Sequence, residues 1–208
     1  MSTIQLDRKL TPKGRATRER IVAAAAQLLQ QRGVWRTSTE EVREAAGVSS
    51  SQLYHYFDDK ASLVRAVIAY QTERALGVQR EHLGHLDSIR ALRKWRDHLV
   101  GIEQGLRCEG GCPLGTLAAQ LAETSAAARV DLCIAFEQWE DGIRSGLRAM
   151  YDRGEFAKNV DPDRLATALL AAVEGGFLLT QVRRNTAPLE DALDTVLDYI
   201  ESLTMRTA

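Results

Sequence analysis

Residues 37–57 contain the side chains whose types and spacing could do chemistry in this sequence. Within six positions the chain carries Ser50, Ser51, Gln52, Tyr54 and His55, a set of hydroxyl, amide and imidazole groups. Such groups at the start of a short helix can contact base edges in the DNA major groove and backbone phosphates. The chemistry they indicate is recognition.

Motifs for catalysis are missing from the sequence. It has no Glu-x-x-His pair, no Gly-x-Ser-x-Gly elbow, no P-loop and no dinucleotide fingerprint. Cys108 and Cys112 lack the Cys-x-x-Cys spacing or the paired histidines of a zinc site. We therefore expect a protein that is not an enzyme, with no catalytic residue, no metal and no cofactor.

Two short helices are expected to position the polar groups, Ser38–Ala46 and Ser50–Phe57. The intervening Gly47-Val48-Ser49 can supply a left-handed helix end, an apolar plug and an N-cap, in that order. On the second helix Leu53 and Phe57, four residues apart, would face inward, which leaves the polar set and Tyr56 on the outer side. This is the layout of a helix-turn-helix.

Helical spacing continues along the chain, and strand signals are nearly absent. We predict an all-α fold of about nine helices, with an N-terminal three-helix domain and a C-terminal helical domain. The other expected helices cover residues 17–32, a segment after Asp59, residues 88–107, 114–122 and 125–153, a segment from Asp161-Pro162, and a last one from about Pro188.

Charge is unevenly distributed between the two ends of the chain. Of 27 Lys and Arg and 28 Asp and Glu, the first 65 residues hold 11 and 7, which gives +4, and the remainder hold 16 and 21, which gives −5. A basic N-terminal module beside an acidic remainder fits a phosphate-facing end with a different task for the rest.

The stretch from about Arg15 to Val67 resembles the DNA-binding domain of TetR-family repressors. The matching residues are Thr37-Ser38, Ala45-Ala46-Gly47-Val48-Ser49, Leu53-Tyr54-His55-Tyr56-Phe57 and Lys60. Arg43, Ser51 and Gln52 depart from the small residues that are common at these positions, so the operator sequence stays open. The resemblance implies two domains, an arm with the helix-turn-helix over residues 1–62 and a ligand-binding and dimerisation domain over residues 63–208.

The resemblance also implies a role for each polar side chain. Ser50, Ser51 and Gln52 would face base edges, and the Gln52 amide could pair bidentately with adenine. Phosphate contacts are expected from Thr37, Thr39, Tyr54, His55 and Lys60, with salt-dependent help from a basic arm that holds Lys9, Lys13, Arg15 and Arg18. Core packing for Tyr54 and a solvated role for Lys60 and the arm are the alternatives.

A single recognition helix reads few bases, so such proteins pair and bind two half-sites. The resemblance implies a homodimer with a four-helix interface from the last two helices, bound to double-stranded DNA at a palindromic operator. Apolar stripes on these two helices could instead fill only the core of their own subunit.

The middle helices would enclose a small, hydrophobic or aromatic effector whose binding releases the DNA. Candidate residues for this site are Trp95, His98, Ile102, Cys112, Phe136, Trp139, Glu174 and Phe177, with Gln181 as a further polar anchor. Core packing is the alternative for each. A ligand-independent regulator, an activator and a helical protein-interaction adaptor are the competing functions.

The sequence Gly111-Cys112-Pro113-Leu114-Gly115 resembles an element in a TetR subgroup whose members respond to aromatic compounds and to reactive electrophiles. Cys112 would lie near the start of a helix at Leu114, where the helix dipole can lower the pKa of a thiol. One hypothesis is a redox or electrophile sensor. The other is a small buried cysteine that lines the pocket.

Signals for membrane insertion and export are weak in this sequence. The longest uncharged apolar-rich stretch, Ala166 to Val173, is shorter than a bilayer span, and the N-terminus is polar and basic. Three cysteines in a chain of this size fit a reducing compartment. We expect a cytoplasmic protein that does not contact a membrane.

Overall fold

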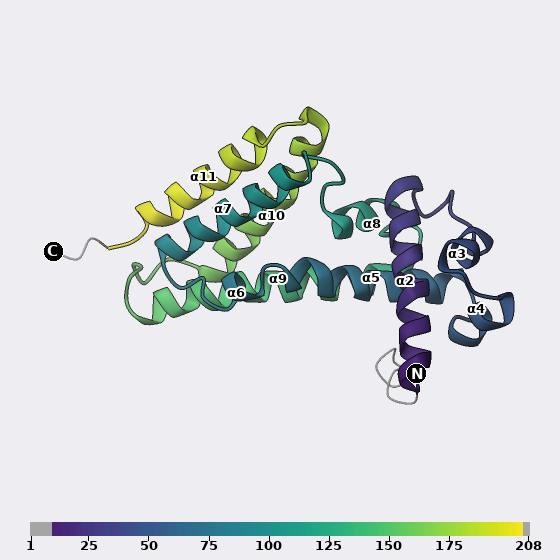
Figure 1. The fold of residues 1–208 in the computed structure, drawn as a ribbon. Helices are drawn as coiled ribbons and strands as arrows, with labels where there is room; N and C mark the ends of the chain where they lie inside the picture. Colours follow the sequence, from purple (N-terminus) through teal and green to yellow (C-terminus); the bar gives the residue numbers. More distant parts are fainter. Residues whose placement is uncertain (1–9, 206–208) are drawn as a thin grey trace. The chain divides into compact units, whose positions relative to one another are not determined.

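A computed structural model describes residues 10–205, and over this range the fold is all-α, as predicted (Figure 1). Its ten helices are α2 (Pro12–Arg32), α3 (Thr39–Ala46), α4 (Ser50–Tyr56), α5 (Lys60–Gly77), α6 (Arg80–Leu83), α7 (Ile89–Gly105), α8 (Pro113–Leu121), α9 (Ala126–Asp152), α10 (Pro162–Arg183) and α11 (Ala187–Ser202).

Local capping chemistry explains most helix ends. The Asp161 carboxylate accepts the backbone N–H groups of Asp163 and Arg164, so α10 starts at the predicted place. The Asp59 carboxylate accepts the N–H of Ser62 at the start of α5, which confirms Asp59 as a cap. Gly154 follows α9 with φ +76°, a value that favours glycine.

Two features differ from the prediction. Helix α2 begins at Pro12 instead of residue 17, because the Thr11 hydroxyl accepts the N–H of Gly14 at 3.1 Å and proline suits the first helical position. The four-residue α6 was not expected, since its sequence carries no side-chain cap. It raises the count from nine predicted helices to ten in the described range.

The chain divides into two compact units. One holds the described residues up to Arg74 together with Thr116–Ala135, and the other holds Ala75–Gly115 with Phe136 to the last described residue. The start of α9 and most of α8 thus pack with the N-terminal helices. Helices α5, α8 and α9 each contribute to both units.

The first unit is built around α2. Ile21, Ala25 and Leu29 are buried along one face of this helix, at the helical spacing expected from the sequence. Helix α3 packs on α2, and the Arg20 guanidinium donates to the Ala46 carbonyl at the end of α3 at 2.9 Å. Arg65 of α5 forms a two-pronged ion pair with Asp131 of α9, at 2.5 and 3.0 Å, on the surface of the unit.

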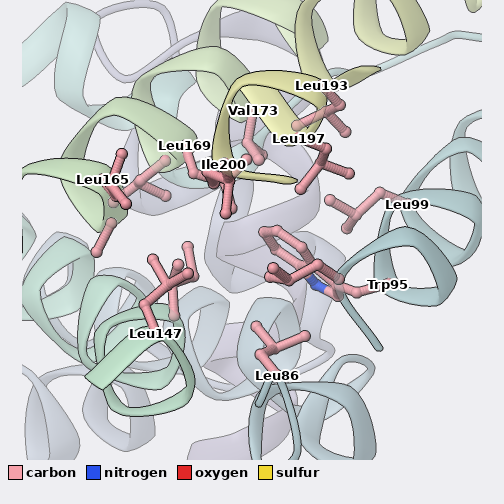
Figure 2. Close-up of a cluster of buried hydrophobic side chains, with 14 of the residues drawn as sticks. Leu86, Trp95, Leu99, Leu147, Leu165, Leu169, Val173, Leu193, Leu197 and Ile200 are labelled. Atoms are coloured by element: carbon pink, nitrogen blue, oxygen red, sulfur yellow. The ribbon is translucent and has the colours of Figure 1, made fainter. Parts of the chain in front are cut away.

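The second unit has a large apolar core, shown in Figure 2. Its side chains come from α7, α9, α10 and α11, and include Trp95, Leu147, Leu169 and Leu197, each at most 1% exposed. The Trp95 indole N–H donates to Gln79 at 2.9 Å, so this buried donor is satisfied. Burial of this kind is the main stabilising contribution to the unit.

Helix α10 is the described helix that is long and apolar enough to cross a membrane by length and composition. Its uncharged part, Ala166 to Val173, is much shorter than this apolar window. In the structure 44% of the apolar window is buried against the rest of the unit, and the buried residues are those that face α11 and the core. We interpret α10 as a core helix of the second unit.

Candidate functional site

The turn between α3 and α4 has the geometry that the sequence predicts. Gly47 has φ +60° and ψ +44°, a left-handed conformation, and its N–H closes the end of α3. Val48 is 6% exposed and fills the space below the turn. Glycine adopts this left-handed conformation without strain, and Val48 packs beneath the turn. Together these two residues fix the orientation of α4 relative to α3.

Helix α4 starts with a reciprocal capping box. The Ser49 hydroxyl accepts the N–H of Gln52 at 3.2 Å, and the Gln52 side-chain oxygen accepts the N–H of Ser49 at 2.9 Å. Leu53 and Phe57 are buried at 2% and 4% exposure, which confirms them as the inward pair. A helix of seven residues is thus fixed by its cap and by two apolar contacts.

The outer side of α4 carries most of the predicted polar set. Ser50, Ser51, Gln52, Tyr54 and His55 are exposed. Tyr56 is half-buried and meets the His55 ring edge-on, with centroids 4.9 Å apart, so it belongs partly to the packing of the domain. Ser51 shares a hydrogen bond of 3.0 Å with Ser49.

Thr37 corrects one expectation. It was expected to contact a phosphate, but its side chain is 2% exposed and its hydroxyl donates to the Gly33 carbonyl at 2.9 Å. The hydroxyl instead ties the loop before α3 to the end of α2. Thr39, in the first turn of α3, is half-buried.

Lys60 is also engaged inside the unit. Its ammonium group donates to the carbonyl oxygen of Val34 at 2.6 Å, and the side chain is half-buried. To contact a phosphate, the Lys60 ammonium group would have to share this hydrogen bond or break it. The N–H of the same Val34 is bound by the side-chain oxygen of Gln120 at 2.7 Å, so both polar atoms of this residue are held by side chains.

Gln120 is a residue that sequence reasoning missed. Besides binding Val34, it lies over Gly33, whose φ is +83° and whose added Cβ would be 2.9 Å from the Gln120 side-chain oxygen. Gln120 and Val34 are 86 residues apart in the sequence. No local pattern marks such a contact, since it depends on how α8 packs against the end of α2.

The basic arm is described only in part. Lys9 lies outside the described residues. Lys13 and Arg15 lie in the first turn of α2, where the Arg15 guanidinium donates to the Leu10 carbonyl at 2.8 Å. Arg18 lies over the Phe57 ring, 5.3 Å from its centroid.

The candidate ligand residues of the second unit fall into two groups. Trp95 is fully buried with its N–H satisfied, His98 lies 2.9 Å from the Val78 carbonyl and stacks on His82, and Ile102 is half-buried on α7. These three are held by neighbours on α6, α7 and the segment between α5 and α6. The remaining residues surround α10.

The second group is formed by Cys112, Phe136, Trp139, Glu174 and Phe177. The ring centroids of Trp139 and Phe177 lie 6.5 Å apart, and the Cys112 thiol lies beside the Glu174 carboxyl. The Glu174 carboxyl presses on Gly115, whose added Cβ would be 2.5 Å from Oε2. Phe136 and Cys112 pack on the edge of the core.

The environment of Cys112 corrects the expectation of an acidic thiol. Burial raises the pKa of this thiol well above its ordinary value, and the Glu174 carboxyl raises it further, while the N–H of Gly115, 3.4 Å from the sulfur, opposes the shift. Burial also raises the pKa of Glu174. Burial thus opposes the ionisation of both groups.

No cluster of three or more His, Cys, Asp or Glu side chains that could hold a metal ion occurs among residues 10–205.

Comparisons with known proteins agree with this geometry. The family model described as "Bacterial regulatory proteins, tetR family" matches residues 21–67, and that of the "Transcriptional regulator LmrA/YxaF-like, C-terminal domain" matches residues 88–195, more than half of the chain. These two ranges contain the helix-turn-helix and the helices from α7 to the middle of α11.

Individual relatives share the whole arrangement. The transcriptional repressor DhaR of Mycobacterium sp. (strain GP1) is 25% identical over 88% of this chain and 91% of its own. The regulator TtgR of Pseudomonas putida is 25% identical over 93% and 95%. A crystal structure of a TetR transcriptional regulator from Chloroflexus aurantiacus superposes with a TM-score of 0.78 at 27% identity, covering 93% of this chain and 98% of that one. The chain belongs to the TetR family of DNA-binding transcriptional regulators, with an LmrA/YxaF-like C-terminal domain, and is not an enzyme.

Proposed function

We propose that this protein is a cytoplasmic repressor that binds a palindromic operator as a homodimer and releases it when a small aromatic ligand enters the C-terminal domain. The observation that carries the proposal is the capped helix α4, which presents Ser50, Gln52, Tyr54 and His55 on one exposed surface. Such a surface at the N-terminal part of a recognition helix suits base edges and adjacent phosphates.

Within this proposal the polar side chains keep the roles given by the family resemblance, with one exception. Ser50, Ser51 and Gln52 face bases, and Thr39, Tyr54, His55 and Lys60 face phosphates. Thr37 is left out, because its hydroxyl is committed to the Gly33 carbonyl.

The dimer is supported by an apolar surface on α10 and α11. Leu178, Leu179 and Val182 of α10 are 60%, 44% and 71% exposed, and Tyr199 of α11 is 57% exposed. Each Leu or Val that a partner covers would contribute about 1.5–3 kcal/mol. Gly175 has open space beside it, so a second copy of α10 could approach closely, whereas Gly176 faces Leu189 within the same chain.

Helix α8 supports the link between ligand and DNA. Its first residues, Pro113 to Gly115, belong to the second unit, where Gly115 lies under Glu174. Its later residues belong to the first unit, where Gln120 holds Val34 ahead of α3. A ligand that displaces the Glu174 carboxyl would thus act on a helix whose other end is bound to the DNA-binding part. The Gly-Cys-Pro-Leu-Gly element contains the start of this helix, and its resemblance to the subgroup that responds to aromatic compounds supports an aromatic ligand.

The test uses the full-length protein and the DNA upstream of its own gene. Footprinting should show two protected half-sites related by a twofold axis, with centres one helical turn or a multiple of it apart. The variant Lys60→Ala should weaken binding to all sequences and flatten the salt dependence, while Lys158→Ala, an exposed lysine of the second unit, should change neither. Equal affinity for this DNA and for random DNA would contradict the proposal.

The dimer is tested separately by sedimentation. Leu178→Glu should produce monomers, because it places a charge in the proposed interface. Val130→Glu is the matched control, since Val130 is 55% exposed on the part of α9 that belongs to the first unit. A dimer that survives Leu178→Glu would contradict the proposed surface.

A further inference from the structure

Four buried side-chain polar atoms in the described part of the second unit have no hydrogen-bond partner. Two of them belong to neighbouring side chains: the indole Nε1 of Trp139, which is 1% exposed, and Oε1 of the Glu174 carboxyl. The other two are Oε2 of Glu103 and Oγ1 of Thr180. A buried polar atom without a partner costs about 1–3 kcal/mol, so such atoms in a folded protein call for an explanation. Trp95, the other buried tryptophan, satisfies its N–H through Gln79, which shows that this fold can provide a partner.

The unpartnered atoms of Trp139 and Glu174 belong to one group of side chains. Phe177 follows Glu174 by three residues on α10, so both project from the same side of the helix. The Trp139 ring lies 6.5 Å from the Phe177 ring, centroid to centroid. Glu174, Phe177 and Trp139 are therefore successive neighbours, with an acidic group at one end and an indole N–H at the other.

One oxygen of the Glu174 carboxyl is closely packed, whereas the other, Oε1, is buried without a hydrogen-bond partner. Oε2 lies 2.5 Å from the position that a Cβ on residue 115 would take, so glycine is required there, and the Cys112 thiol lies beside the carboxyl. A buried carboxyl oxygen without a partner costs less in the neutral acid than in the carboxylate, and the neutral acid can donate a hydrogen bond. Burial also raises the pKa of this carboxyl.

The shape of the group favours a flat apolar molecule. The Trp139 and Phe177 rings are buried, whereas Cys112, Phe136 and Glu174 are half-buried at the edge of the core. Buried rings behind a half-exposed rim can accept an aromatic ring by stacking and edge contacts.

We propose that Trp139, Glu174 and Phe177 form the effector site, and that it takes an uncharged aromatic molecule with a carbonyl or similar hydrogen-bond acceptor. The acceptor would receive hydrogen bonds from the Trp139 N–H and from the Glu174 acid, and the ring would lie against Phe177. The inference rests on the proposed function, since it names the ligand class of the C-terminal domain.

An anion and a cation both fit less well. An anionic ligand would place a buried charge beside the apolar Trp139 and Phe177 rings, which costs more than burying a neutral acceptor. A cationic ligand would pair with an ionised Glu174, but would leave the Trp139 N–H without an acceptor. A neutral acceptor can take hydrogen bonds from the Trp139 N–H and the Glu174 acid without burying a charge.

The test compares three probes of similar size by titration calorimetry with the full-length protein: 1-acetonaphthone, 1-naphthoate and (1-naphthylmethyl)trimethylammonium. The neutral ketone should bind at least about tenfold more tightly than either ion, which is the effect of one additional satisfied hydrogen bond. Preference for the cation or the anion would overturn the inferred ligand class. Failure of all three probes to bind would overturn the site.

Variants identify the contacting groups. Trp139→Phe keeps an aromatic ring but removes the N–H, and should weaken ketone binding about tenfold. Trp35→Phe is the matched control, and should leave ketone affinity unchanged, because Trp35 is 65% exposed and belongs to the first unit. Glu174→Gln, which keeps a donor and no charge, should bind the ketone within about threefold of the wild type.

Unchanged ketone affinity in Trp139→Phe would overturn the assignment of that residue. If the wild type binds the cation and Glu174→Gln does not, Glu174 is an ionised anchor and not a neutral acid. Operator binding by the same protein without any probe tests the proposed function separately. Specific DNA binding with no effect of the ketone would therefore refute only the inferred ligand site.

Discussion

Substitution of Gln52 separates two roles that the structure gives to one side chain. Its amide oxygen accepts the Ser49 N–H in the capping box, at 2.9 Å, and the side chain is exposed on the proposed DNA-facing side of α4. A carbonyl oxygen has two lone pairs, so the cap and a bidentate contact with adenine are compatible. Gln52→Ala removes both, whereas Gln52→Glu keeps the cap, because glutamate serves equally well at this position of a capping box.

The expected magnitudes differ for stability and for DNA binding. Loss of the cap in Gln52→Ala should lower the free energy of unfolding by about 0.5–1 kcal/mol, and Gln52→Glu should leave it unchanged. Loss of a base contact costs about 1–3 kcal/mol per half-site, which is about 2–6 kcal/mol for a dimer on two half-sites. Operator affinity should therefore fall by about 30-fold to about 20,000-fold in both variants.

The assay is fluorescence anisotropy with operator and random duplexes at one fixed salt concentration, combined with urea denaturation of each variant. Both variants should lose operator affinity, and only Gln52→Ala should lose stability. If Gln52→Glu retained the wild-type preference for the operator, base contact by Gln52 would be wrong, and its role would be confined to the cap. Equal losses of Gln52→Ala on operator and random DNA would lead to the same conclusion.

Three further predictions concern the second unit. Gly146→Ala should lower the free energy of unfolding by about 1–3 kcal/mol, since the added Cβ would collide with backbone atoms of Leu86. Gly101→Ala should raise the free energy of unfolding by about 0.5–1 kcal/mol, because there is open space beside Gly101 and alanine favours a helix. Thermal midpoints measured at equal protein concentration would contradict this if both variants shifted in the same direction. Burial raises the pKa of Glu103, so its contribution to stability is present below the unfolded value near 4.5 and is lost as the pH rises through the higher folded value. The difference in free energy of unfolding between Glu103→Gln and the wild type should therefore favour the variant more at pH 7.5 than at pH 4.5. Urea titrations that find the same difference at both pH values would refute this. Cys112 should react with iodoacetamide more slowly than the exposed Cys133 at pH 7.5, because burial raises its pKa; mass spectrometry that finds Cys112 labelled first would restore the sensor hypothesis.

Much of the fold follows from short-range chemistry that a sequence displays directly. Serine or aspartate before an apolar-periodic segment, proline in a first helical turn and glycine after a last turn act within four residues of one another. The caps at Ser38, Ser49 and Asp161 and the left-handed Gly47 and Gly154 were predictable for this reason. The DNA-binding motif was recognisable because its required residues lie within one short stretch.

The sequence by itself did not determine which polar side chains are free to bind. Thr37 and Lys60 match the family pattern, yet the structure commits both to carbonyl groups, of Gly33 and Val34. Which backbone carbonyls lie within reach of a side chain depends on the packing of α2, α3 and α5, which residue type and spacing do not specify.

Tertiary structure alone also decided the character of the ligand candidates. From the sequence, a helix dipole predicts an acidic Cys112, but burial beside Glu174 has the opposite and larger effect. Trp95 and Trp139 carry the same side chain on apolar helix faces, and only packing shows that one N–H has a partner while the other has none. Local sequence therefore determined the helices and the recognition motif, since capping and periodicity are short-range. Long-range packing decided which groups remain unsatisfied and available to a ligand, since hydrogen bonding and desolvation depend on residues far apart in the chain.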